Sequence, residues 1–409
     1  MAVNVPVHVV TVGLPSGGLD DPEGAAVAQA LGGAGLPVSA RAFVDEDETA
    51  LERVLAAEGG ITVIVSGPGS SAGDIVRRVV ARATAARLAL NDRMLAALEE
   101  RHRRHDRPLP RRDERLALLP QGAVVWTAGD DEPGWMLESP RGVFVVLPRG
   151  ASVGLVTDRL VPLISGRFAG RGAVLTRTLK TAGVAIGDVE ERLAGWLGKE
   201  RDIAVVVAPA DGEVWIRLRA RGASPAEAAV ALASAESDIG AALGVDCYGG
   251  EGDSLEQVVG RLLAARQLTL SVAESCTGGL LGHRITTVPG SSAYFERGVI
   301  VYSNRAKMEL LGVPEAVLRA HGAVSAPTAE AMARGICDRS GSACGLSITG
   351  VAGPDGGTPA KPVGTVFIGL AVRDEVVARR FRFLGDRASI KWQSSLMALD
   401  MLRRKLAGE

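Results

Sequence analysis

Short apolar runs that end in glycine-rich turns most constrain the fold of this chain. VHVVTVG covers residues 7–13, and ITVIVSGPGSS covers residues 61–71. Apolar runs of this length are typical of parallel strands buried on both faces, and the glycines allow tight turns into the following helices. Aromatic residues make up only 4% of the chain, so aliphatic side chains must fill the core, which suits helices layered on sheets. The sequence therefore predicts an α/β protein that begins with a doubly wound unit.

The length of 409 residues predicts two or three domains, since a single domain usually holds roughly 100–200 residues. We expect three. Residues 1–166 are predicted to form the doubly wound α/β domain. Residues 167–250 hold two strand candidates and a helix that Ser224 would cap, as in a small α+β domain. Residues 254–409 alternate strands with helices and are predicted to form an α/β/α domain.

The third domain has clear signals at both of its ends. Ser254 and Gln257 have the spacing of a capping box, which predicts that a helix begins after Ser254. A long terminal helix is predicted at about 387–406. The strand candidates between them are LTLSVA, RGVIVYS, ACGLSIT, VGTVFIGLAV and VVARRFRF.

Charge and composition exclude several kinds of partner. The net charge of −1 lacks the basic footprint of a non-specific nucleic-acid binder, so the arginine-rich stretch 99–115 is interpreted as a solvated helix end and loop. We find no signal-peptide pattern and no apolar run near the ~18 residues that span a bilayer, so no membrane partner is expected. The cysteines form no C-x-x-C pair and no metal-ligand spacing with histidine, which favours a cytoplasmic setting. They are Cys247, Cys276, Cys337 and Cys344.

The stretch SVAESCTGGLLGHR, residues 271–284, places three possible nucleophiles side by side: Ser275, Cys276 and Thr277. A strand is predicted to end just before Ser275 and a helix to start at Cys276, so Ser275 lies where open α/β sheets bind ligands. Free backbone N–H groups of residues 276–279 would point to the same place and could stabilise an oxyanion or a phosphate. The alternative interpretation, which is given equal weight, is that these small residues only permit a tight turn and have no catalytic role.

A second candidate group lies in RGVIVYSNRAK, residues 297–307. A strand is predicted to end at Tyr302, and a helix to begin at Ser303 or Asn304. Lys307 then falls near the helix start, where the helix dipole and any burial both lower the pKa of an amine. Together with Ser275 these residues could form a Ser–Tyr–Lys nucleophilic group. A solvated surface lysine is the simpler alternative.

A third candidate group lies between residues 347 and 366. A predicted strand delivers Thr349 to the same sheet edge, and the Gly- and Pro-rich loop after it allows close approach to a phosphate or ribose. The loop lacks a P-loop motif, and Lys361 is not in the register of one. Arg387, at the start of the predicted last helix, is a possible anion contact.

Five motifs together resemble the C-terminal domain of the CinA family, in order and in spacing. They are AESCTGGLL, YSNRAKMELLGV, HGAVSAPTAEAMA, SITGVAGPDGG…KPVGTV and GDRASIK. That domain is similar to nicotinamide-mononucleotide deamidases, which hydrolyse the carboxamide of nicotinamide mononucleotide to nicotinate mononucleotide and ammonia. The resemblance implies hydrolysis of this substrate without a cofactor, in a protein that forms homodimers.

By position, the resemblance implies Ser275 as the nucleophile, with Tyr302 and Lys307 as its activating partners. Cys276 would be a small buried residue that supplies a backbone N–H. The family usually has Glu where Arg305 stands, but positions 305 and 307 project about 200° apart on a helix, so Lys307 should keep its role. The implied substrate-binding residues are Thr277, Gly278, Gly279, Thr349, Gly350, Gly353 and Arg387.

The other two domains resemble the family's remaining domains more loosely. The middle domain is KH-like but has no basic-flanked G-x-x-G, so nucleic acid is not expected to bind there. The first is similar to molybdopterin-binding domains that in relatives hydrolyse ADP-ribose, but Pro15 stands at an acidic position and Gly73 beside Asp74 replaces a second Asp. Its divalent-metal site and pyrophosphatase activity are therefore predicted to be lost. The alternative for the whole chain is a non-catalytic adaptor in competence or the DNA-damage response.

Overall fold

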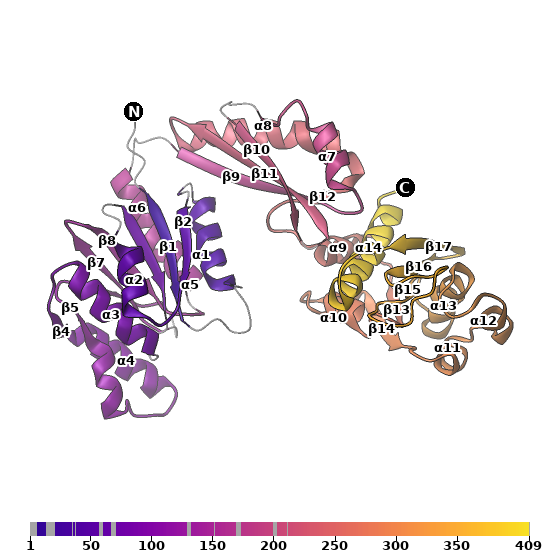
Figure 1. Ribbon diagram of the computed structural model, residues 1–409, viewed down its shortest axis with the longest axis horizontal. Coiled ribbons are helices and arrows are strands. Elements are labelled where there is room, and N and C mark those ends of the chain that lie inside the picture. Colours follow the sequence, from indigo (N-terminus) through magenta and orange to yellow (C-terminus); the bar gives the residue numbers. More distant parts are fainter. Residues whose placement is uncertain are drawn as a thin grey trace. The chain divides into compact units, whose positions relative to one another are not determined.

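The computed structural model is shown in Figure 1. It describes residues 6–13, 21–34, 36, 38–56, 60–66, 71–128, 132–150, 152–168, 173–198, 203–210 and 212–408. Contacts within the chain define two compact units. The first unit comprises Met1–Thr176, Glu200–Ile203 and Arg219–Ser234; the second comprises Arg177–Lys199, Ala204–Leu218 and Ala235–Glu409.

The N-terminal sheet has six strands in the order β2-β1-β3-β8-β7-β6. Strands β2, β1, β3 and β8 run parallel to one another. Strand β7 pairs antiparallel with β8, and β6 pairs antiparallel with β7. The strands are β1 (Val7–Val12), β2 (Val38–Val44), β3 (Ile61–Val65), β6 (Val124–Trp126), β7 (Gly134–Ser139) and β8 (Gly142–Leu147). A separate hairpin joins β4 (Leu88–Leu90) to β5 (Leu118–Pro120).

Helices lie on both faces of this sheet, as the two separate apolar clusters beside it show. One cluster joins the sheet to α2, α3 and α4, and the other joins it to α1 and the helical segment before β9. The predicted doubly wound architecture is therefore confirmed. The helices are α1 (Pro22–Gly33), α2 (Glu48–Leu55), α3 (Ser71–Ala83), α4 (Asp92–Arg104), η1 (Arg111–Ala117), α5 (Ser152–Leu155), η2 (Val156–Leu160) and α6 (Val161–Phe168).

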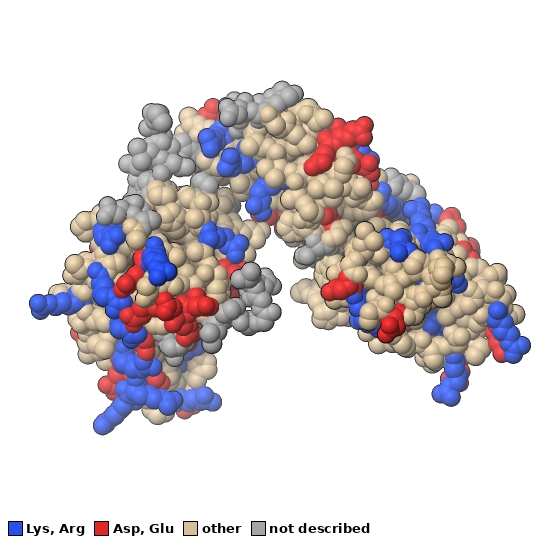
Figure 2. Space-filling view, in the orientation of Figure 1, with Lys and Arg blue, Asp and Glu red and all other residues tan. Residues whose placement is uncertain are grey.

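The arginine-rich stretch 99–115 forms the end of α4, a short loop and the start of η1, and most of its side chains are exposed. Several of its arginines pair with neighbouring acids, as Arg104 does with Glu100 at 3.0 Å. Figure 2 shows Lys and Arg atoms interspersed with Asp and Glu atoms over this unit. The interpretation as a solvated helix end is confirmed.

The middle segment is a four-stranded sheet in the order β10-β11-β9-β12, with one long helix. The predicted strand pair corresponds to β10 and β11, and the hydroxyl of Ser224 accepts a hydrogen bond from the N–H of Glu227 at 3.2 Å, as expected of a cap. The elements are β9 (Ala173–Thr181), α7 (Ile186–Arg192), β10 (Ile203–Ala210), β11 (Glu213–Gly222), α8 (Pro225–Leu243), η3 (Gly244–Asp246) and β12 (Cys247–Gly249).

Helix α8 contains no continuous apolar run of about 18 residues, but its overall composition is apolar. Pro225–Asp246 is long and apolar enough to cross a membrane by length and composition, with a mean hydropathy of 1.3. The prediction considered continuous apolar runs, whereas α8 owes its hydropathy to many alanines between scattered polar residues. One face of the helix is buried, at Ala228, Leu232, Ala235, Ile239 and Leu243, which is the pattern of a helix that packs on one side.

The C-terminal domain is a five-stranded sheet in the order β14-β13-β15-β16-β17. The first three strands are parallel, and β16 and β17 are antiparallel. Helices α9 and α14 share an apolar cluster with one face of the sheet, and α11 and α13 with the other, which confirms the predicted α/β/α layers. The capping box is also present, since the Ser254 and Gln257 side chains each accept from the other's N–H.

The bounds of its elements follow the predictions closely, with two exceptions at the candidate site. Strand β14 ends at Ile300, two residues before Tyr302, and α10 begins at Leu280, four residues after Cys276. The elements are α9 (Leu255–Ala265), β13 (Leu270–Glu274), α10 (Leu280–Thr286), η4 (Ser291–Ala293), β14 (Phe295–Ile300), α11 (Asn304–Leu311), α12 (Glu315–His321), α13 (Ala326–Ser340), β15 (Cys344–Gly350), β16 (Thr365–Val372), β17 (Glu375–Arg382) and α14 (Arg387–Ala407).

Candidate active site

Ser275 is the first residue after β13, the strand at the centre of the three parallel ones. Its N–H donates to the carbonyl of Ile348 at 2.9 Å, so the backbone stays tied to β15 for one residue beyond the strand. The chain then turns through Gly278 and Gly279, whose φ angles of +60° and +95° lie in the left-handed region, which glycine adopts without strain. The turn leaves the Ser275 side chain at the carboxyl edge of the sheet.

The hydroxyl of Ser275 lies beside the amine of Lys307. The Lys307 Nζ donates to Ser275 Oγ at 3.1 Å and to the carbonyl of Val301 at 2.7 Å. Lys307 is only 1% exposed and Ser275 8%. Burial lowers the pKa of Lys307, and Lys307 forms no ion pair with a carboxylate among the residues that the structure describes. The structure thus brings together two of the three predicted catalytic residues, and Lys307 is not a solvated surface lysine.

The local sequence explains why Lys307 points inward. Ser303 caps α11, because its hydroxyl accepts from the N–H of Ala306 at 3.1 Å, and this sets the first turn of the helix. Lys307 then lies on the face toward the sheet, whereas Arg305 is exposed and pairs with Glu309 at 3.4 Å. The expectation that the residue at 305 leaves Lys307 in place is confirmed.

The carboxylate of Glu274 occupies the start of α10. It accepts three backbone N–H groups, from Gly279 at 3.0 Å, Leu281 at 3.1 Å and Gly282 at 2.8 Å. Glu274 is 1% exposed, so the carboxylate replaces water as the partner of the N–H groups that a helix start leaves free. It ties the turn that follows Ser275 to the end of β13.

This contact corrects the prediction that all N–H groups of residues 276–279 are free. The N–H of Gly279 donates to Glu274, and that of Gly278 donates to the Ser275 carbonyl at 3.2 Å. Within the described part of the chain, the N–H groups of Cys276 and Thr277 have no acceptor on another residue. Those two remain as possible donors to an oxyanion.

The two side chains after Ser275 are both buried but differ in chemistry. Cys276 is 6% exposed and belongs to the apolar core of the domain. Burial raises the pKa of its thiol to about 11, so the thiol is protonated at neutral pH and is a poor nucleophile. The hydroxyl of Thr277 is fully buried and has no hydrogen-bond partner among the described residues. An unpaired buried hydroxyl is costly, which is consistent with a site that a ligand completes.

Tyr302 and Arg387 form a second group near the sheet edge. The guanidinium of Arg387 donates to the carbonyl of Gly353 at 2.7 Å and to the Tyr302 hydroxyl at 3.2 Å. Tyr302 is 64% exposed, and in the region described it shares no hydrogen bond with Ser275 or Lys307. The structure therefore places Tyr302 with Arg387 and the glycine-rich loop rather than in direct contact with the Ser–Lys pair.

Thr349 and Gly350 are two of the implied substrate-binding residues, and both make contacts within the protein that hold the sheet edge. The Thr349 hydroxyl is buried and donates to the carbonyl of Ala323 at 2.8 Å. A Cβ atom at Gly350 would lie 2.7 Å from Val366, so only glycine fits there. Both residues shape the edge of the sheet beside Ser275.

Sequence reasoning missed Glu274 and Lys391. The Nζ of Lys391 lies 3.8 Å from the position that a Cβ would take at Gly278, so this cation lies beside the turn after Ser275. Lys391 also lines a cavity of about 650 Å³ that starts at Leu280 and continues along the first turns of α14. The signal was present, since Lys391 follows Arg387 by four residues, one turn along the same helix.

The residues of the predicted lost site in the N-terminal domain are only partly described. Pro15 lies outside the described residues. Asp74 pairs with Arg77 and Arg115, so two guanidinium groups occupy its carboxylate. The described residues hold no cluster of three or more His, Cys, Asp or Glu side chains suited to a metal. The loss of the metal site stays a prediction.

The fold and the site define a multi-domain α/β protein whose C-terminal domain holds a buried serine–lysine pair at a sheet edge. Residues 252–406 match the family model of the CinA C-terminal domain, and residues 176–249 match that of the damage-inducible protein CinA KH domain. A putative competence-damage inducible protein of Symbiobacterium thermophilum is 37% identical over 391 residues, which cover 91% of this chain and 92% of that protein. The chain belongs to the CinA family.

A second relative supports this assignment. A CinA-like protein of Gemmatimonas aurantiaca is 35% identical over 414 residues, covering 98% of this chain and 97% of its own. Among solved structures, the competence damage-inducible protein A of Klebsiella pneumoniae is 34% identical and covers 38% of this chain and 96% of its own, with a TM-score of 0.37.

Proposed function

We propose that the C-terminal domain hydrolyses the carboxamide of nicotinamide mononucleotide to nicotinate mononucleotide and ammonia. The observation that carries this proposal is the buried contact between Lys307 Nζ and Ser275 Oγ. The choice of substrate depends on the resemblance of the five sequence motifs to nicotinamide-mononucleotide deamidases. A free pyridine nucleotide is therefore the expected small-molecule partner.

The first step is the activation of Ser275. A neutral amine has two hydrogens and one lone pair, and Lys307 can donate one hydrogen to the Val301 carbonyl while its lone pair accepts the Ser275 proton. Burial lowers the pKa of Lys307 and so raises the fraction of neutral amine. The hydroxyl oxygen of Ser275 then adds to the carboxamide carbon.

The tetrahedral intermediate carries a negative oxygen that needs donors. The N–H groups of Cys276 and Thr277 are the available ones in the turn, since Glu274 holds those of Gly279, Leu281 and Gly282. Each donor to an oxyanion typically lowers the activation free energy by roughly 2.7–4 kcal/mol. Glu274 acts as a positioning residue, because it keeps the other N–H groups paired and the turn in one conformation.

The remaining steps return the protein to its starting state. The proton on Lys307 passes to the amide nitrogen, the C–N bond breaks and ammonia leaves. Water, deprotonated by the same amine, then attacks the ester carbon on Ser275, which releases the carboxylate and restores the hydroxyl. This chemistry requires no metal or cofactor.

The nucleotide phosphate needs cations near this edge. Lys391 lies beside the turn after Ser275, and Arg387 holds the glycine-rich loop at Gly353. We infer that Lys391 contacts the phosphate and that Arg387 and Tyr302 keep the loop in the position that binds the ribose.

The test measures ammonia release from nicotinamide mononucleotide, with nicotinate mononucleotide identified by mass spectrometry. Ser275→Ala and Lys307→Met should each lower the rate by at least about 10²-fold, the lower range for loss of a nucleophile or general base. Ser292→Ala and Arg305→Met, the latter on the same helix as Lys307, are matched controls at exposed positions and should leave the rate unchanged. Full activity of Ser275→Ala would refute the nucleophile.

A non-catalytic adaptor is the alternative, suggested by the names of the relatives. The buried Lys307 argues against it, because it has no carboxylate partner among the described residues, and desolvating such an amine costs stability that a scaffold need not lose. Absence of ammonia release from the folded wild-type protein, with every pyridine nucleotide tested, would favour the adaptor.

A further inference from the structure

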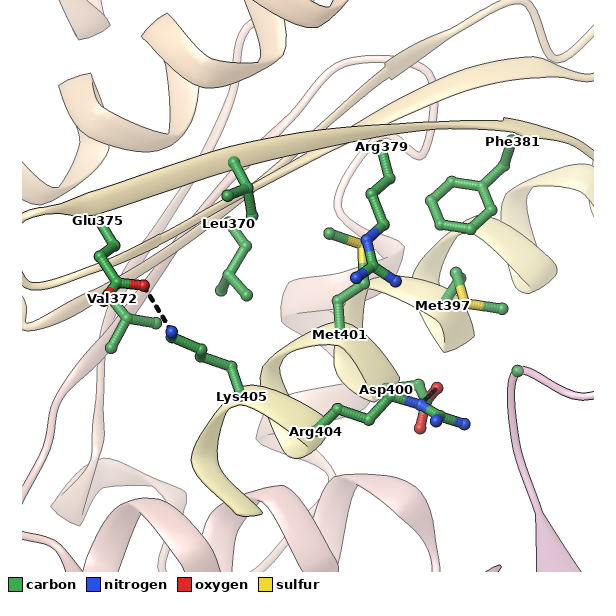
Figure 3. A pocket seen from close by; sticks show the side chains of 12 residues that line it. Leu370, Val372, Glu375, Arg379, Phe381, Met397, Asp400, Met401, Arg404 and Lys405 are labelled. Carbon is green, nitrogen blue, oxygen red and sulfur yellow. Dashed lines mark hydrogen bonds and ion pairs between the residues drawn. The ribbon is translucent and has the colours of Figure 1, made fainter. Parts of the chain in front are cut away.

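A cavity of about 500 Å³ lies between the β16–β17 hairpin and the second half of α14 (Figure 3). Its lining does not include Ser275, Lys307, Arg387 or Lys391, so it is separate from the candidate active site. Its volume lies within the range of about 300–1,000 Å³ that is usual for small-molecule sites.

Half of the twelve residues that line the cavity have apolar side chains. These are Leu370, Val372, Val377, Phe381, Met397 and Met401. Leu370 and Met401 are 4% and 6% exposed, so the floor is part of the core, whereas Val377 is 48% exposed and lies at the mouth. Methionine side chains adapt to ligands of different shape, and Figure 3 shows both thioethers facing the cavity from α14.

Two of the three cations at the cavity are neutralised by carboxylates of the protein. Lys405 pairs with Glu375, and Arg404 pairs with Asp400 at 2.7 Å and with Asp246 at 2.6 Å. Arg379, in contrast, has no ion pair or hydrogen bond within the described residues. Figure 3 shows its side chain extending from β17 toward α14, with the guanidinium above Met401.

The alternation of β17 places Arg379 on the cavity side. Glu375, Val377, Arg379 and Phe381 all line the cavity, so every second residue of the strand faces it. Arg382 has the opposite parity, and both arginines are exposed to solvent. A guanidinium that has no partner among the described residues and lies at the mouth of a partly apolar cavity suits a planar anionic group attached to an apolar body.

We propose that this cavity binds a small amphipathic anion, an aromatic body that carries a carboxylate or a sulfonate. The aromatic part packs on Met397, Met401 and Phe381, and the anionic group accepts hydrogen bonds from Arg379. The site does not depend on the proposed deamidase function, because no residue is shared between the two.

The test uses two fluorescent probes of similar shape on the full-length protein. 8-Anilinonaphthalene-1-sulfonate carries the anionic group, and N-phenyl-1-naphthylamine lacks it. Arg379→Gln should weaken binding of the sulfonate about tenfold, the size of one hydrogen bond between charged groups, and should change binding of the neutral probe less than twofold. Val377→Trp, which fills the mouth, should abolish binding of both.

Arg382→Gln is the matched control, since it removes the same charge from the other side of the same strand. It should leave both affinities within twofold of wild type, and the thermal unfolding midpoint of each variant shows whether the fold is kept. The proposal is overturned if the sulfonate does not bind saturably to the wild type, if Arg379→Gln and Arg382→Gln weaken it equally, or if Val377→Trp leaves both probes bound.

Discussion

Lys307 Nζ lies 3.1 Å from Ser275 Oγ, and both side chains are almost completely buried although they come from different strand–helix turns. The two turns follow β13 and β14, which are parallel neighbours, so their carboxyl ends meet at one edge of the sheet. In the described part of the chain this lysine amine has no carboxylate partner, and desolvation is the main cause of its lowered pKa.

The first prediction concerns pH. Burial lowers the pKa of Lys307 from its ordinary value of 10.5, and the active form is the neutral amine. The kcat/KM for ammonia release should therefore rise with pH through the lowered pKa and level off before pH 10.5. Because the unfolded chain binds the Lys307 proton more tightly, the contribution of this group to stability also rises with pH between the lowered value and 10.5.

A pH–rate profile of the wild type, measured with nicotinamide mononucleotide, checks this expectation. The residual activity of Lys307→Met should lack the rising limb. A limb with its midpoint at or above 10.5, or one that survives in Lys307→Met, would contradict the role of the amine.

The second prediction concerns Glu274. Glu274→Gln removes the charge that accepts three N–H groups and places an amide N–H₂ among donors. We expect a loss of about 1–3 kcal/mol in the free energy of unfolding, the cost of leaving a buried group unsatisfied. We also expect kcat to fall more than KM changes, because the carboxylate positions the turn after Ser275 and does not contact the substrate.

Denaturant unfolding and steady-state kinetics on the same preparation measure the two effects. Glu309→Gln, at an exposed position of α11, serves as the control and should change neither. An unchanged stability in Glu274→Gln would show that the three hydrogen bonds contribute nothing net.

The third prediction distinguishes Cys276 from its neighbour. Burial raises the pKa of the Cys276 thiol to about 11, so iodoacetamide at pH 8 should not modify it in the native protein. Peptide mass mapping should find Cys276 alkylated only after unfolding, and ammonia release should survive the treatment of the native protein. Rapid alkylation of native Cys276 together with loss of activity would indicate a thiolate at the site.

The sequence was sufficient to predict the layers of the fold, and the motifs that resemble the CinA family were needed to predict the Ser275–Lys307 pair. Apolar strand patterns ending in glycine turns specify an α/β sheet, and parallel neighbours bring their carboxyl ends together. The use of Glu274 could not be predicted, because its carboxylate is satisfied by N–H groups that become available only once the turn has formed. In the sequence, Glu274 shows only as the last residue of a predicted buried strand.

Two other features depend on exact element ends, which sequence patterns specify poorly. Tyr302 lies two residues beyond the end of β14, so its hydroxyl meets Arg387 rather than Lys307. The cavity beside Arg379 depends on the distance at which α14 packs on β16 and β17, and no local sequence pattern predicts that distance.

The last prediction concerns Asp246, which joins the middle segment to α14. Its carboxylate accepts hydrogen bonds from Arg404 and Arg192, each at 2.6 Å. Desolvation raises the pKa of Asp246, but these two hydrogen bonds outweigh it and the pKa lies below the ordinary value of 3.8. A lowered carboxyl pKa stabilises the fold above pH 3.8, and this stabilisation is lost as the pH falls through the lowered value. Asp246→Asn should therefore lower the free energy of unfolding by about 1–3 kcal/mol at pH 7, and this difference from the wild type should shrink below about pH 4.

Denaturant unfolding at pH 7, 5 and 3.5 measures this difference, with Asp374→Asn at an exposed turn as the control. A difference that stays constant over this range would mean that the packing of residue 246, and not its charge, stabilises the contact.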